Sequence, residues 1–81
     1  MTQKDIAKKL DVLIHHWISH NDEHANEYRK WADRLAAEGL NDIAASIRRA
    51  ADLVSASNSE FSSAQGKLEE LSHEGKNNDP L

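Results

Sequence analysis

Three histidines in the first half of the chain have the spacing that metal sites on helices use. His16, His20 and His24 follow one another at intervals of four residues, so in a helix they rise along one side. Two imidazoles four residues apart can share one ion. Glu27 follows His24 by three residues and can add a carboxylate. Because imidazole suits Zn, Ni, Cu and Fe, the pattern predicts a divalent transition metal without naming the element.

Two asparagines fall at the level of these histidines when the chain is folded back on itself. A reflection about Gly39 brings Asn21 or His20 level with Asn58, which interrupts an apolar stripe of its own. Buried imidazoles and amides must be hydrogen-bonded, because an unpaired group costs about 1–3 kcal/mol. The sequence therefore predicts a buried polar layer made of His20, His24, Asn21 and Asn58.

Three functions are open for this layer. The first is that the layer binds the metal ion. The second is that it only fixes the register of the helices, as a buried asparagine does in a coiled coil. The third is a pH switch, in which the imidazoles become protonated in acid and loosen the bundle. We expect a small protein without enzymatic activity that binds a metal. The main alternative is a structural or protein-interaction module.

Composition and missing motifs exclude other classes of function. The chain has no Gly-rich phosphate loop, no G-x-S-x-G elbow and no H-E-x-x-H motif, so we expect no catalytic residues. The absence of cysteine excludes disulfides and thiolate metal sites. A net charge of −4 disfavours a nucleic-acid partner. No apolar run approaches the roughly 18–20 residues that span a bilayer, so we expect a cytoplasmic protein without a membrane partner.

Start and stop signals divide the chain into two helices. Thr2 can cap the first helix, and Gly39 can end it in a Schellman motif closed by Leu40. Asn41 can cap the second helix, and Gly75 can close it. These signals predict a helix over about 3–38, a turn at 39–41, a helix over about 42–74 in a single domain of residues 1–75, and a flexible tail at 76–81.

The predicted fold class is all-α, an antiparallel hairpin that dimerises. A helix of about 35 residues is about 50 Å long, whereas a compact globule of this chain length is about 30 Å across. A lone hairpin is therefore a rod with an exposed apolar patch, which a homodimeric four-helix bundle or another protein partner would bury. The alternative is a monomeric three-helix bundle with a break near Ser57, where Ser57 and Glu60 have capping-box spacing.

Large apolar and aromatic residues at helical spacing define the face expected to pack. On the first helix they form one stripe, which Ile14 and Ala32 widen: Ile6, Leu10, Leu13, Trp17, Tyr28, Trp31 and Leu35. The stripe of the second helix consists of Leu40, Ile43, Ile47, Ala51, Val54, Phe61, Leu68 and Leu71. Because each helix covers only one side of the other's stripe, we expect some apolar residues of a lone hairpin to remain partly exposed: Trp17, Ile18, Trp31, Ile14 and Leu53. The aromatic members of the first stripe, with Phe61 from the second helix, are interpreted as anchors of the core or of the interface between copies.

The segment from His16 to Ala32 reads H-W-I-x-H-N-x-x-H-x-x-x-Y-x-x-W-A, where the first letter is His16. It resembles a signature of small uncharacterised prokaryotic helical proteins, and the resemblance extends through Leu71. The resemblance implies no particular activity. It supports treating as one set His16, His20, Asn21, His24 and Trp31.

Overall fold

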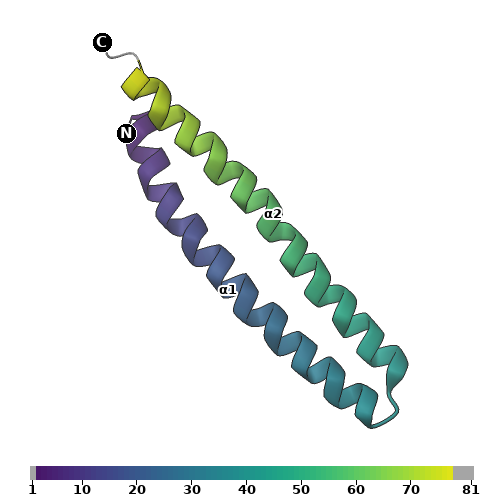
Figure 1. Cartoon of the computed structure of the whole chain (residues 1–81). Helices are drawn as coiled ribbons and strands as arrows, with labels where there is room; N and C mark the ends of the chain where they lie inside the picture. Colours follow the sequence, from purple (N-terminus) through teal and green to yellow (C-terminus); the bar gives the residue numbers. More distant parts are fainter. Residues whose placement is uncertain (1, 78–81) are drawn as a thin grey trace.

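The chain folds into two long antiparallel helices, which confirms the predicted all-α hairpin. The computed structural model describes the backbone of residues 2–77 and the side chains of residues 2–71. Helix α1 spans Gln3–Ala37 and helix α2 spans Asn41–Asn77. The helices lie side by side, with both ends of the chain at one end of the rod and the turn at the other (Figure 1). The rod measures 65 × 18 × 16 Å.

The helix ends follow from local hydrogen bonds. Thr2 caps α1, because its Oγ1 accepts a hydrogen bond from the Asp5 backbone N–H at 3.1 Å. Gly39 adopts φ +80°, and the Leu40 N–H donates to the Leu35 carbonyl oxygen at 2.9 Å, as expected for a Schellman motif.

Helix α2 begins one residue earlier than predicted and ends later. The Ala44 N–H donates to the Leu40 carbonyl oxygen at 3.0 Å, which places Asn41 inside the first turn instead of at the cap. The helix continues through Gly75 to Asn77. The predicted tail at 76–81 thus overlaps the helix at its first two residues, and positions 78–81 lie outside the described residues.

The alternative three-helix bundle is wrong, because α2 runs unbroken through the serine-rich segment. The Ser57 hydroxyl donates to the Val54 carbonyl oxygen at 2.6 Å. This hydroxyl bonds back to its own helix instead of capping a new one, which a serine in a helix interior commonly does.

Small side chains line the seam between α1 and α2. The buried apolar residues are Ala7, Ile14, Ala25, Ala32, Ala44 and Ala51, and among the described side chains Ile14 is the one large group that is fully buried. Alanine lets the two backbones approach closely, but it removes little apolar surface from water. The seam lies to one side of the large apolar stripe of α1, so the expected exposure of Trp17, Trp31 and Leu53 is confirmed. The expectation that Ile14 remains partly exposed is wrong, because Ile14 is only 2% exposed. Within residues 2–77, neither helix carries a stretch long and apolar enough to cross a membrane.

Candidate functional site

The two asparagines meet across the seam near the middle of the rod. The Asn21 side-chain amide donates to Asn58 Oδ1 at 3.0 Å and to Ser57 Oγ at 3.3 Å. The Asn58 amide donates in turn to the Ile18 carbonyl oxygen at 3.3 Å and to Asp22 Oδ1 at 2.9 Å. These bonds tie α1 to α2 at one level, so they select one register of the two helices.

The histidines do not belong to this amide layer, which is itself half-buried. His16, His20 and His24 are all exposed, and no buried polar side chain occurs among residues 2–71. The predicted layer of His20 and His24 with the asparagines is therefore wrong for its histidines. The reason is geometric: Asn21 occupies the seam, and the neighbouring residue on a helix points about 100° away from it.

The exposed histidines form a ladder of rings along α1. The ring centroids of His16 and His20 are 4.8 Å apart, those of His20 and His24 are 5.4 Å apart, and the Tyr28 ring stacks on His24 at 6.0 Å. We call His16, His20 and His24 the histidine ladder. Neighbouring imidazoles in it are close enough to ligate one ion after small rotations of the side chains.

Within one chain the histidine ladder lacks a full set of ligands. Among the side chains that the structure describes, no three potential ligands converge on one point. Glu27 is exposed and borders a shallow hollow with Lys30, Trp31 and Arg34, so it is not brought together with the imidazoles. A single chain thus offers two imidazoles at most to one ion, which leaves the remaining coordination positions to water or to another molecule.

Large apolar side chains gather on the same side of the rod as the histidine ladder. Trp17 contacts Phe61 of α2, with ring centroids 5.6 Å apart, so this side is shared by both helices. Positions three, four and seven residues from these rings lie on the same faces of α1 and α2. The outer apolar face, as we name it, consists of exposed residues that are 38–52% accessible: Ile6, Leu13, Trp17, Trp31, Leu40 and Ile43.

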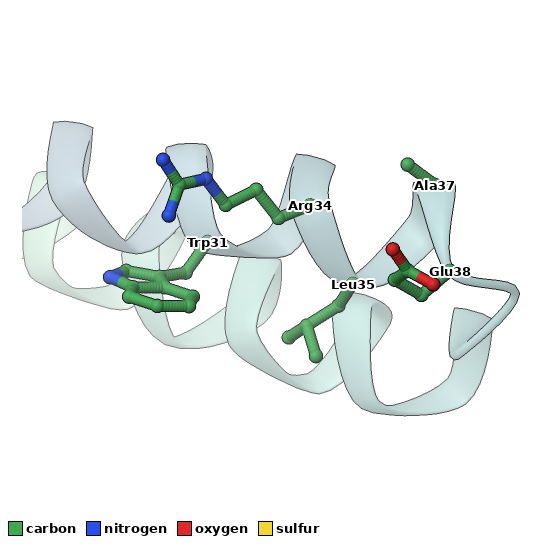
Figure 2. A pocket seen from close by; sticks show the side chains of 5 residues that line it. All are labelled: Trp31, Arg34, Leu35, Ala37 and Glu38. Carbon is green, nitrogen blue, oxygen red and sulfur yellow. The ribbon is translucent and has the colours of Figure 1, made fainter.

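Trp31 is the largest exposed group near the turn. Its residue exposure is 52%, and the Arg34 guanidinium carbon lies 5.1 Å from the ring centroid. Figure 2 shows the Arg34 side chain folded back over the indole, and it shows Trp31 and Leu35 extending from the same side of α1. A cation placed over an indole stabilises this arrangement at an exposed site by about 0.5–1 kcal/mol.

Ion pairs occupy the opposite side of the rod. Arg29 donates to Asp52 Oδ1 at 3.2 Å and to Ser55 Oγ at 3.1 Å, and Arg48 donates to Asp33 Oδ1 at 2.9 Å. These exposed pairs add little stability. They do show that one side of the hairpin is closed by polar contacts between α1 and α2, whereas the outer apolar face has no such cover within the described chain.

The sequence pattern predicted that large aromatic residues stay exposed, but it placed His20 and His24 in the buried layer. The stripe that contains Trp17 and Trp31 is exposed beside the seam, while Tyr28 and Phe61 are half-buried. The seam was predicted only in part: Ala32 and Ala51 belong to the predicted apolar stripes, whereas Ala25 and Ala44 were missed. The signal that could have found them is a heptad spacing of alanines. Ala25 and Ala32 are seven residues apart, as are Ala44 and Ala51.

One family matches the chain, over residues 10–68, and it is described as a domain of unknown function (DUF8180). The match includes the histidine ladder, both asparagines of the seam and the Trp17–Phe61 contact. No curated protein matches the chain, and no solved structure matches it.

Proposed function

We propose that the chain, which belongs to the DUF8180 family, is a non-enzymatic assembly module that pairs with a second copy of itself. The two hairpins would pack through their outer apolar faces and form a four-helix bundle. The observation that carries this proposal is the exposure of Trp17, Trp31 and their apolar neighbours along one side of the rod, while the other side is closed by ion pairs.

The size of the outer apolar face suits a stable interface. The face runs along a rod of 65 × 18 Å, whose whole side is roughly 1,200 Å² in projection. A standard protein interface buries about 800 Å² per partner. A face of this area can therefore hold a stable partner, and exposed apolar patches of several hundred Å² mark interaction sites on soluble proteins.

A second copy is the occupant that fits this face best. A partner must be as long as the rod to cover the exposed residues from Ile6 to Leu40, and another hairpin has the same length and the same uncovered face. The alanine seam also supplies little burial to a single hairpin, and domains of this size commonly gain stability by oligomerisation.

The distribution of groups along α1 favours an antiparallel pair. His20 is the middle residue of α1, seventeen residues from each end. Trp31 lies eleven residues after it, and a shallow apolar hollow lined by Lys8, Lys9, Val12 and Leu13 lies seven to twelve residues before it. A two-fold axis at His20 brings Trp31 of each copy level with this hollow on the other. Such an arrangement is isologous, so it closes at two copies.

Metal binding by the histidine ladder is the second component of the proposed function. Its support is the ring spacing of 4.8 and 5.4 Å on an accessible helix face. The pH-switch hypothesis has weaker support, since it assumed imidazoles that are buried within the hairpin, and these rings are exposed. The alternative in which the polar layer only fixes register applies to Asn21 and Asn58.

The proposal is tested by the mass of tag-free protein in solution. Sedimentation equilibrium should give twice the 9.1 kDa of one chain, with dissociation on dilution. Trp31→Glu should shift the equilibrium to single chains, because it places a charge in the apolar contact. Leu53→Glu is the matched control, since Leu53 is 72% exposed, does not belong to the outer apolar face and lies about 80° round α2 from Phe61. Single chains at every concentration, or a wild-type chain that binds lipid vesicles as a monomer, would contradict the proposal.

A further inference from the structure

We propose that two copies of the chain together form a divalent transition-metal site at their two-fold axis, with His20 and His24 of each copy as the four ligands. This inference rests on the proposed antiparallel dimer. It extends that proposal by naming the ligand, the residues that hold it and the reason that neither copy holds it alone.

The position of His20 on α1 brings it to the two-fold axis. His20 is the middle residue of α1, on the side of the helix that carries Trp17 and Leu13. When two α1 helices pack antiparallel, positions equally far from the middle face one another, so the middle residue meets its own copy. The imidazoles of the two copies thus approach each other at the axis.

The lean of helical side chains decides which second histidine reaches the axis. Side chains on an α-helix tilt toward the helix N-terminus. His24 lies one turn past the axis, so its imidazole leans back toward the axis, and the same holds in the other copy. His16 lies one turn before the axis and leans away from it. This difference selects His24 as the partner of His20, although the His16 and His20 rings are also close, at 4.8 Å.

Two histidines from each copy supply the ligands that a transition metal prefers. Neutral imidazole binds Zn, Ni, Cu and Fe, and four ligands complete the tetrahedral shell that zinc prefers. His20 and His24 are separated by 5.4 Å between ring centroids, and Tyr28 stacks on His24 with an interplanar angle of 18°. The stacked ring restricts the rotation of His24, which lowers the entropy lost when the imidazole becomes a ligand.

The incomplete site in one chain makes metal binding and pairing interdependent. Within the described residues, no chain gathers three ligands by itself. An ion held by two imidazoles in a single chain gains two more when the second copy arrives. Metal must therefore favour the dimer, and the dimer must favour metal by the same factor. When free zinc is about 100 times the dissociation constant of the site, the dimer dissociation constant should fall about 100-fold.

The test uses tag-free, chelator-treated full chain and Zn²⁺ as the probe. Titration calorimetry should give one ion per two chains, and sedimentation equilibrium with added zinc should show the tighter dimer. His20→Ala and His24→Ala should each remove both effects. His15→Ala is the matched control, because His15 is exposed on another side of α1, 3.9 Å from Asp11, and should leave both effects intact.

Each alternative outcome overturns a different part of the reasoning. A dimer that takes up no zinc, or whose dissociation constant is unchanged by it, refutes the metal site and leaves the pairing proposal standing. Single chains with and without zinc refute both. One ion per chain, lost equally in His16→Ala and His20→Ala, refutes the shared site, since the ligands would then come from one helix alone.

Discussion

Truncation of Trp31 tests how much the outer apolar face contributes to pairing. A tryptophan buries up to about 250 Å² when fully covered. Since Trp31 is 52% exposed in the single hairpin, about 130 Å² per copy is available to a partner. At about 25 cal/mol per Å² this is about 3 kcal/mol per copy and about 6 kcal/mol for the two copies of a dimer, as an upper estimate.

Partial coverage in the dimer reduces this value. If half of the area is covered, Trp31→Ala weakens the dimer by about 3 kcal/mol, which raises its dissociation constant about 100-fold. The fold of the single hairpin should change little, because Trp31 lies outside the buried seam and its contact with Arg34 is exposed.

The assay is sedimentation equilibrium over a range of concentrations, with circular dichroism to confirm that the variant is folded. Leu53→Ala serves as the control, since Leu53 is even more exposed, at 72%, and does not belong to the outer apolar face. If Trp31→Ala changes the dissociation constant no more than Leu53→Ala does, Trp31 is not part of the interface and the reasoning fails.

Two further predictions concern the single hairpin. Asn58→Ala removes the acceptor for Asn21 and the bond to Asp22, so urea denaturation should show that the free energy of unfolding falls by about 1–3 kcal/mol. Ser59→Ala changes an exposed neighbour and should cost less than about 0.5 kcal/mol. Equal losses would show that the amide pair does not stabilise the register. Alanine at the two described glycines should have opposite effects on stability. Gly39→Ala should lower the melting temperature, because it forces alanine to φ +80°. Gly66→Ala should raise the free energy of unfolding by about 1 kcal/mol, because Gly66 lies in the interior of α2 and a Cβ there meets nothing within 4 Å. The reverse order of the two melting temperatures would contradict the assigned turn.

The ends of the helices were predictable because their signals are local. Thr2 and Gly39 act through hydrogen bonds to backbone groups three to five residues away, so their roles do not depend on the rest of the fold. The level at which Asn21 meets Asn58 also followed from a short turn and the constant rise of a helix. A tight connection leaves little freedom to slide one helix along the other.

The rotation of the helices about their axes was not predictable by the same means. The apolar surface of α1 is wide enough to serve two contacts, the seam with α2 and the outer apolar face. Large residues such as Trp17 and Leu13 dominate a pattern based on hydrophobicity, so the pattern defines a wide stripe without showing which edge of it enters the seam. Ile14 was therefore expected to stay partly exposed, although it is only 2% exposed. Ala25 and Ala32 carry a weak hydrophobic signal, yet they occupy the seam because small side chains permit close approach of the helices.

His20 was assigned to the seam for the same reason, although the residue that occupies the seam is the next one in the sequence. His20 and Asn21 are neighbours in the sequence, and a pattern that cannot distinguish two adjacent faces cannot decide which of them enters the seam. The structure assigns Asn21 to the seam and His20 to the outer side. This change moves the proposed metal site from the interior of one hairpin to the surface between two copies.

The central claim, antiparallel pairing of two hairpins about the middle of α1, can be measured directly by electron–electron distances between spin labels. The chain has no native cysteine, so single labels can be attached after His16→Cys and Lys4→Cys. At 1.5 Å per residue, the two labels at position 16 should lie about 12 Å apart along the rod and the two at position 4 about 48 Å apart. Short distances at both positions would indicate parallel hairpins, the absence of any distance would indicate single chains, and either result would contradict the claim.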